Sequence, residues 1–247
     1  MAATATDAIV LQSFPYGETS RIVRLLTRSA GVHSAIAKGA LRPRSRYALM
    51  EPFAEGAAML YIRDTRDLQT LGGFDLTRSR QGLGRDLLRF GGASLVAEIV
   101  LRTASEESHP ALYDAVASGL DRLLAVEGDA VEVCVLAVTW HLIAELGFTP
   151  VLDCCIACGR GIEANRDATF DYAAGGVRCD GCAAGLPGSR IPARARTALS
   201  EFSSGRPARV GATAGHWRLL TRYLEHHVLE GAPLRSLHFV ATSLSVG

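Results

Sequence analysis

The sequence has no long hydrophobic run and no leader-like start. Its longest apolar stretch, residues 131–148, is interrupted by Glu132, Thr139, His141 and Glu145. A membrane-spanning helix needs about 20 predominantly apolar residues, so this stretch predicts a buried helix instead. Residues 1–7 contain no basic residue ahead of an apolar core, which disfavours a signal peptide. We therefore expect a soluble, cytoplasmic protein with no membrane partner.

The chain also lacks a recognisable set of catalytic residues. It has seven histidines, and none stands at a telling spacing from a carboxylate or a nucleophile. His226 and His227 are neighbours on a predicted helix and point to different faces, while His141 lies within the apolar helix. We predict that the protein is not an enzyme.

Acidic residues are missing altogether between Thr19 and Met50. This stretch has seven basic residues: Arg21, Arg24, Arg28, Lys38, Arg42, Arg44 and Arg46. Cationic side chains that converge without competing acids bind phosphate groups, and a nearby aromatic ring stacks on a base. The pattern favours a nucleic-acid interface centred on residues 38–46, with Tyr47 or Phe53 as a stacking face. A solvated, arginine-rich loop is the alternative.

Hydrophobic periodicity gives the chain a β-rich start. Five short apolar segments are separated by turn sequences such as PYGE and RPRSR, and they cover residues 7–14, 20–27, 32–40, 56–63 and 67–74. They predict a small closed barrel of the OB type, although an SH3-like barrel fits the pattern almost as well. Residues 1–6 are expected to be frayed.

From Gly82 onward, apolar residues recur at helical spacing. We expect helices that begin near Leu83 and at Pro110, a third after a capping box formed by Asp129 and Glu132, and two more over 192–202 and 214–229. The predicted class is a multidomain α+β protein. Its parts are an OB fold at 1–80, a helical domain at 81–150, a cysteine-rich ribbon at 151–188 and the remainder of the helical domain at 189–247.

Two CxxC pairs lie close together in the chain. Cys155 pairs with Cys158 and Cys179 with Cys182, and 20 residues separate the pairs. Each CxxCG turn points both of its sulfurs at one spot, so two such turns predict a tetrahedral, structural zinc site. Gly159 and Gly181 are expected to ease the two turns.

Two other cysteines are left out of this assignment. Cys154 would give the less regular spacing CxxxC, and Cys134 fits the core of a helix. Four thiolates leave no open coordination position, which disfavours a zinc hydrolase. Iron or thiol-redox chemistry is the alternative to structural zinc, although the helix-opening context of a redox CxxC is not visible.

The motifs, in their order, resemble the RecO family of bacterial DNA repair and recombination proteins. The opening AIVLQSFPYGETSRIVRLLTRSAG, the basic AKGALRPRSR with LMEPF after it, and GFTPVLDCCIACG are similar to successive family motifs. FDYAAGGVRCDGC and the closing LRSLHFV extend the likeness from Asp7 to about Val240. Leu41 departs from the pattern because the family has a basic residue there.

This resemblance implies an OB fold, a helical domain and a zinc ribbon that uses Cys155 rather than Cys154. It implies binding of single- and double-stranded DNA, annealing of complementary strands, and work in the RecF pathway at the nucleoid. Its implied partners are RecR and the tail of the single-stranded DNA-binding protein SSB, with RecA loaded onto gaps as the outcome.

The implied SSB tail is acidic and apolar at its end, so its site needs an apolar groove and an arginine. The candidates are Arg85, Arg89, Arg102 and Arg122. Two functions of other classes stay open, namely a zinc-stabilised protein-interaction scaffold and a thiol-redox protein.

Overall fold

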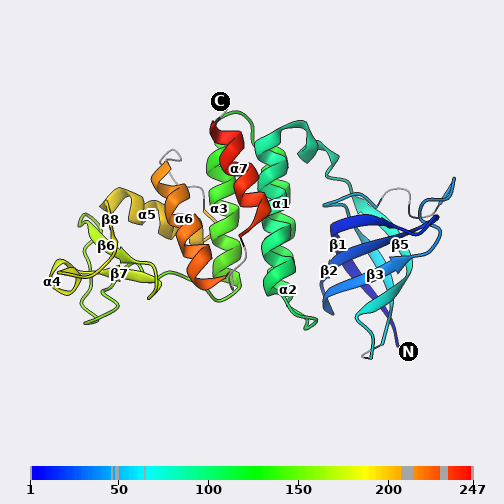
Figure 1. Cartoon of the computed structure of the whole chain (residues 1–247), viewed down its shortest axis with the longest axis horizontal. Helices are drawn as coiled ribbons and strands as arrows, with labels where there is room; N and C mark the ends of the chain where they lie inside the picture. The colour runs from blue at the N-terminus through cyan, green and yellow to red at the C-terminus, as the bar shows by residue number, and fades with distance from the viewer. Residues whose placement is uncertain are drawn as a thin grey trace. The chain divides into compact units, whose positions relative to one another are not determined.

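The structure is a computed structural model that describes residues 2–45, 47, 50–63, 65–206, 214–228 and 233–245. The chain folds as two units, residues 1–125 and 126–247, and each is described by itself (Figure 1). The first unit contains the barrel and two helices, and the second contains the cysteine-rich ribbon and the other helices. The domain boundaries after residues 80, 150 and 188 stay predictions.

Five strands close into a barrel in the first unit. They are β1 (Ala2–Tyr16), β2 (Ser20–Thr27), β3 (Gly31–Ala37), β4 (Glu55–Ile62) and β5 (Leu68–Arg78). The strand order is β1-β2-β3-β5-β4, and β4 pairs with β1 to close the barrel. Within these five strands, β3 and β5 are the parallel pair. A five-stranded barrel with this crossover confirms the predicted OB type.

The first strand is longer than the sequence predicted. Residues 1–6 were expected to be frayed, which is wrong for the described part, because Ala2 to Ile9 pair with Ile62 to Glu55 of β4. A bulge between Val10 and Gln12 then lets the same strand continue along β2. β1 thus pairs with both β4 and β2. Its C-terminal end extends beyond the part that pairs with β4.

The barrel interior is filled by alternate residues of the strands. Val23 and Leu25 of β2 and Leu60 of β4 are fully buried, and they pack with Leu71 and Phe74 of β5 in one hydrophobic cluster. Alternation with period two follows from the pleat of a strand. The interior of the barrel is therefore a packed core, and ligands are expected on its outer surface.

Two helices and a 3₁₀ turn complete the first unit: η1 (Gln81–Arg85), α1 (Leu87–Thr103) and α2 (Pro110–Ala125). The helix expected near Leu83 begins only at Leu87, since the Asp86 carboxylate accepts a hydrogen bond from the Arg89 amide at 2.7 Å and caps it there. The start at Pro110 is confirmed.

A buried arginine joins the barrel to α2. The Arg80 guanidinium has no solvent exposure and lies 2.6 Å from Glu55 of β4 and 2.7 Å from Asp121 of α2. It also donates to the Phe53 carbonyl oxygen at 3.1 Å. Tyr113 of α2 donates its hydroxyl to Glu55 at 2.9 Å, and burial followed by the charge of Glu55 raises the pKa of that hydroxyl. The charges of both elements are thereby paired through a fully buried guanidinium.

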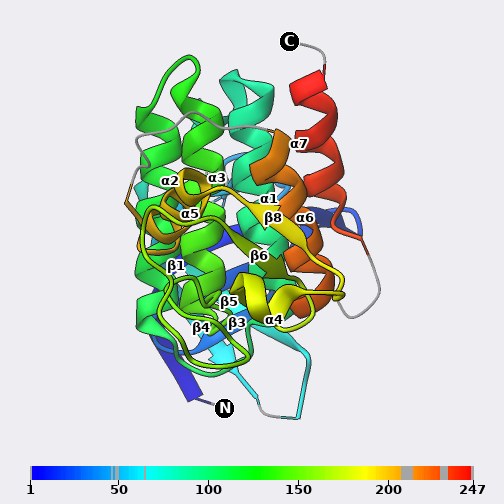
Figure 2. The same ribbon diagram turned by 90° about the vertical axis from the view of Figure 1, so that its left-hand side faces the viewer.

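The second unit is built on an apolar helix. Its elements are α3 (Ala130–Glu145), β6 (Ala168–Asp171), β7 (Gly176–Arg178), α4 (Asp180–Ala183), β8 (Ser189–Ile191), α5 (Ala193–Ser203), α6 (Ala214–His227) and α7 (Arg235–Ser245). The short strands form one sheet in the order β7-β6-β8, and the chain can be followed from β8 into α5 in Figure 2. Between the CxxC pairs, β6 and β7 form an antiparallel hairpin.

The ends of α3 match the sequence in part. Gly147 adopts a φ of 88°, a conformation that favours glycine, and ends the helix. The capping box is wrong, because Asp129 makes no side-chain cap and Glu132 instead accepts a 2.6 Å hydrogen bond from the Trp217 indole of α6. No helix among the described residues is long and apolar enough to cross a membrane.

Replacing Arg80 with methionine tests the buried ion pairs of the first unit. Arg80→Met leaves Glu55 without its cation and Asp121 with Arg78 alone, so we expect hydrogen exchange to show β4 and α2 destabilised by about 3 kcal/mol. Arg78→Met is the matched control, because Arg78 is 55% exposed and also pairs with Asp121. Its cost should stay below about 1 kcal/mol. Equal effects of the two substitutions would contradict the role given to Arg80.

Candidate nucleic-acid interface and metal centre

The loop after β3 forms one part of the candidate nucleic-acid interface. It leaves the barrel at Lys38 and folds through tight turns, in which the Arg42 amide donates to the Gly39 carbonyl oxygen at 3.1 Å. Gly39 has a φ of 74°, a conformation that favours glycine. The Leu41 amide donates to the Thr19 carbonyl oxygen at 2.8 Å. The loop is thus tied to the turn between β1 and β2.

Three of the predicted basic residues lie together on this loop. Lys38, Arg42 and Arg44 are exposed, and no ion pair is recorded for them within the described part of the chain. Arg44 has a φ of 60°, which is uncommon for a residue with a side chain. The charge lost at Leu41 is therefore supplied by its neighbour, Arg42. Arg46 lies outside the described residues.

The other three predicted basic residues lie on or just after β2 and have different surroundings. Arg21 pairs with Ala37, next to the base of the loop, and is half-buried. Arg24 donates to the Leu101 carbonyl oxygen of α1 at 3.3 Å. Arg28 lies 2.8 Å from Asp114 and 4.4 Å above the Tyr113 ring. Arg24 and Arg28 therefore hold α1 and α2 against the barrel. The basic residues that remain for the candidate interface are those of the loop and Arg21.

The aromatic residues expected to stack on bases are buried. Tyr47 is 3% exposed and donates its hydroxyl to the Leu71 carbonyl oxygen at 2.9 Å. Phe53 is 4% exposed and packs edge-on against Phe90, with ring centroids 5.9 Å apart. The prediction that these rings stack on bases is wrong, because both rings complete the hydrophobic core. The residues next to them in the sequence do not indicate this burial.

Two other aromatic residues are available instead. Tyr16 is 51% exposed and Phe14 is 39% exposed, and they stand two residues apart on the projecting end of β1. That end leads into the turn that Leu41 contacts, so the rings and the basic loop belong to the same end of the barrel. Glu18 is the acidic residue of this turn. The alternation of Phe14 and Tyr16 is the sequence signal for this pair of exposed rings. Assigning the sequence PYGE to a turn hid that signal.

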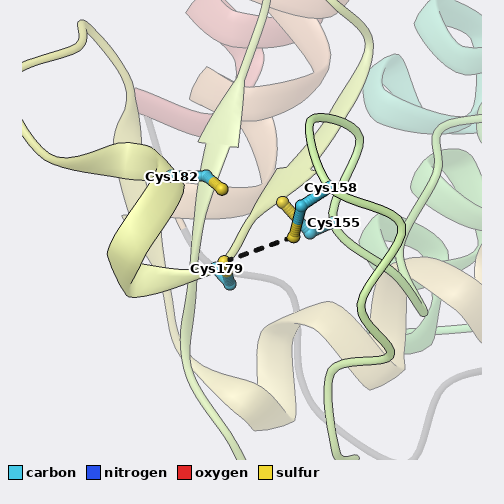
Figure 3. Close-up of side chains that lie close together, drawn as sticks. All are labelled: Cys155, Cys158, Cys179 and Cys182. Atoms are coloured by element: carbon cyan, nitrogen blue, oxygen red, sulfur yellow. Dashed lines mark hydrogen bonds between the residues drawn. The ribbon is translucent and has the colours of Figure 1, made fainter.

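The candidate metal centre consists of four cysteines. The sulfur atoms of Cys155, Cys158, Cys179 and Cys182 all lie within 4.8 Å of one another (Figure 3). The sulfurs of Cys158 and Cys179 are 3.9 Å apart. A regular tetrahedron with Zn–S bonds of about 2.3 Å has sulfurs about 3.8 Å apart. The spacing is therefore close to that of a tetrahedral four-cysteine site.

The two CxxC turns are built differently. In the first, the Gly159 amide donates to the Cys155 carbonyl oxygen at 2.8 Å, and Gly159 has a φ of 71° that confirms its predicted role. In the second, Cys179 precedes the short helix α4, and the Cys182 amide donates to its carbonyl oxygen at 3.0 Å. Gly181 lies within that helix and a side chain there meets nothing within 4 Å, so its predicted role is wrong.

Two of the four sulfurs, those of Cys155 and Cys182, have pKa values shifted in opposite directions. Hydrogen bonds from backbone amides, that of Cys179 first, lower the pKa of Cys155 to about 6. Hydrogen bonding with Cys179 raises the pKa of Cys182 to about 12, and bonding with Cys158 and Cys155 adds to the effect. One thiolate is therefore stabilised while a neighbour keeps its proton. A divalent cation removes this opposition, because it favours the thiolate form of every ligand.

Neither of the two remaining cysteines joins the cluster. Cys154 forms an isolated bridge with Gly161, and burial followed by the nearby Asp153 carboxylate raises its pKa. Cys134 is buried within α3, where the sequence placed it. The geometry thus selects the same four residues as the two CxxC spacings.

A buried arginine fastens the first CxxC turn to α5. Arg196 donates to the carbonyl oxygens of Leu152 at 2.7 Å, Ile162 at 3.2 Å and Arg166 at 3.1 Å, and also to that of Glu163. The residue is 5% exposed. A guanidinium has five N–H donors in a fixed plane, which suits it to several carbonyl oxygens at once. The loop over residues 152–166 therefore has a second anchor besides its cysteines.

Comparison with known proteins gives matches over nearly the whole chain. The family model described as Recombination protein O N terminal matches residues 1–80, and the one described as Recombination protein O C terminal matches residues 84–238.

Individual relatives agree with these models. The chain is 32% identical over 231 residues to the DNA repair protein RecO of Anaeromyxobacter sp. (strain K), with 89% of each chain covered. It is 33% identical over 199 residues to the protein of the same name from Bacillus subtilis, covering 79% of this chain and 74% of that one. The match to the Heliobacterium modesticaldum protein of that name is 36% identical over 158 residues, which are 64% of this chain and 56% of the relative.

The anchoring role of Arg196 is open to a direct test. Arg196→Met leaves four carbonyl oxygens without their donor, so opening of the loop should become easier by about 3 kcal/mol. Hydrogen exchange of the amides of residues 153–162 measures this change. Arg194→Met on the exposed side of α5 is the control and should leave the exchange rates as they are. Unchanged protection in Arg196→Met would show that the cysteines alone hold the loop.

Proposed function

The chain belongs to the RecO family of DNA repair proteins, and on that premise we propose that it is a recombination mediator that binds DNA and anneals complementary strands. The observation that carries the proposal is the end of the barrel where Lys38, Arg42 and Arg44 stand exposed beside Tyr16 and Phe14. The cations neutralise phosphates of a strand and the rings stack on its bases. Neither contact reads a particular sequence.

Annealing on such a surface needs no catalytic group. Two complementary strands repel each other through their phosphates, and a basic surface lowers that repulsion while base pairing supplies the free energy. The exposed loop suits this task because its cations can contact the phosphates of a strand and leave the base edges free to pair. We therefore propose that the protein is a mediator and not an enzyme.

We propose partners on the basis of the family. They are RecR and the acidic tail of SSB, and their joint outcome is the loading of RecA onto SSB-coated gaps in the cytoplasm, at the nucleoid. The arginines first considered for the SSB tail lie on η1, α1 and α2, and one of them, Arg102, lies 3.1 Å from Glu98.

The four cysteines are proposed to hold one zinc ion with a structural role. Bound there, the ion would cross-link the two CxxC turns and so replace a hydrophobic core that the small ribbon lacks. Other parts of the chain hold the two turns in place: Arg196 anchors the first turn, and α4 positions Cys182 of the second. Four thiolates around one ion leave no position for a substrate, which favours this role over redox or hydrolytic chemistry.

The loop assignment predicts the effect of reversing two charges. Arg42→Glu with Arg44→Glu should weaken binding of single-stranded DNA by at least about tenfold and reduce the salt slope of log K by about 1.4, since each lost phosphate contact accounts for about 0.7. Fluorescence anisotropy over a salt series measures both quantities.

The matched control for this variant is Arg166→Glu with Arg206→Glu, two exposed arginines of the second unit. It changes the net charge equally and should keep the affinity and the slope. If the folded loop variant binds DNA as the unmodified chain does, the loop assignment is wrong. A chain that does not bind naked DNA at all would favour the alternative of a protein-interaction scaffold.

The metal proposal predicts one zinc per chain and a defined response to cysteine variants. Cys158→Ser should lower the zinc content well below one per chain, while Cys154→Ser should keep it, as measured by atomic emission. Zinc uptake should release protons, and Cys182 is one source because its pKa of about 12 keeps it protonated at neutral pH. A coloured protein with iron, or loss of zinc in Cys154→Ser, would refute the assignment.

A further inference from the structure

The second unit has a groove that the proposed DNA loop does not use. It has a volume of about 800 Å³ and lies between β8, α5 and α6. Its buried lining includes Trp140, Leu199 and Leu219. Four arginines also line it, and we call it the arginine groove: Arg190, Arg194, Arg218 and Arg222.

The charge of the arginine groove is of one sign. No acidic residue is among the described residues that line it. Arg190 is paired outside it, at 3.1 Å from Asp180. Arg194 of α5 and Arg218 of α6 are exposed, and neither forms an ion pair with any residue that the structure describes. Two guanidinium groups from different helices are thus available to an anion.

The groove also offers flat surfaces. Tyr172 lines it, and the Arg222 guanidinium lies 5.3 Å from the centre of the Tyr172 ring. The His226 ring stacks on Tyr172 with centroids 6.3 Å apart and an angle of 19°. The tyrosine is therefore already held in a layered arrangement of planar groups. A ligand that suits both features has repeated anionic groups and flat, apolar parts.

We propose that the arginine groove binds a segment of single-stranded DNA, so that the chain has one DNA site in each unit. Guanidinium groups match phosphates through their planar fork, and the apolar lining with Tyr172 accommodates a base. An acidic peptide has the charge but lacks the regular alternation of anion and flat ring. This inference rests on the proposed function, since a second strand has a use in a protein that anneals DNA.

The test counts binding sites for a short oligonucleotide. A labelled strand of about six thymidines lies within the site sizes of single OB folds, so it reports each site separately. The groove variant is Arg194→Glu with Arg218→Glu, and Arg194→Gln with Arg218→Gln removes the charges without reversing them. The loop variant is Arg42→Glu with Arg44→Glu, and Arg166→Glu with Arg206→Glu is the control. Zinc content and circular dichroism show whether each variant is folded.

The expected result is two strands bound per unmodified chain and per control, and one per chain in the groove variants and in the loop variant. Ultraviolet cross-linking of iodouridine strands should label Tyr172 in the unmodified chain and lose that label in the groove variants.

One strand per unmodified chain, kept by the groove variants and lost in the loop variant, overturns the groove proposal and leaves the loop assignment standing. One strand per unmodified chain, kept by the loop variant and lost in the groove variants, supports the groove as a DNA site and rejects the loop assignment. If the groove variants keep all DNA sites but no longer bind a peptide with acidic and apolar terminal residues, the groove is a peptide site and the inference is wrong.

Discussion

Closure of the barrel decides where the other features of the first unit lie. Because β1 pairs with β4 along one half and with β2 along the other, its far end projects with Phe14 and Tyr16 on it. The parallel pairing of β3 with β5 requires a long connection from β3 to β4, and that connection contains the basic loop. The hydrogen bond between Leu41 and Thr19 then joins the loop to the β1–β2 turn. Cations and rings gather at one end as a consequence of strand order.

Burial assigns different tasks to one residue type, arginine. Arg80 and Arg196 are enclosed and satisfy carboxylates or carbonyl oxygens, so they hold elements of their own unit together. Arg28 sits in an intermediate position and pairs with Asp114. Arg42 and Arg44 are exposed and keep their charge for a ligand. Since a buried unpaired charge is costly, only the exposed arginines are free to exchange water for phosphate.

The local features of the chain were predictable because each has a local cause. The strand segments, the start of α2 at Pro110, the end of α3 at Gly147 and the two CxxC turns all follow from nearby residues. The misplaced features depend on distant partners. Tyr47 was expected to face DNA, but it completes a core to which all five strands of the barrel contribute. Glu132 was expected to cap its own helix, but it accepts a hydrogen bond from Trp217 of α6 instead.

The cysteines and the basic loop differ in what they contribute to the account. The four cysteines could hold a metal ion, and the proposed structural role rests on them, whereas the exposed loop is what the proposed function requires. Annealing of two complementary oligonucleotides by the purified chain therefore tests the central claim most directly. The account predicts that the chain accelerates annealing of naked strands without any nucleotide cofactor, and that added salt suppresses the acceleration. Annealing at the spontaneous rate at low salt, by a folded chain, would contradict it.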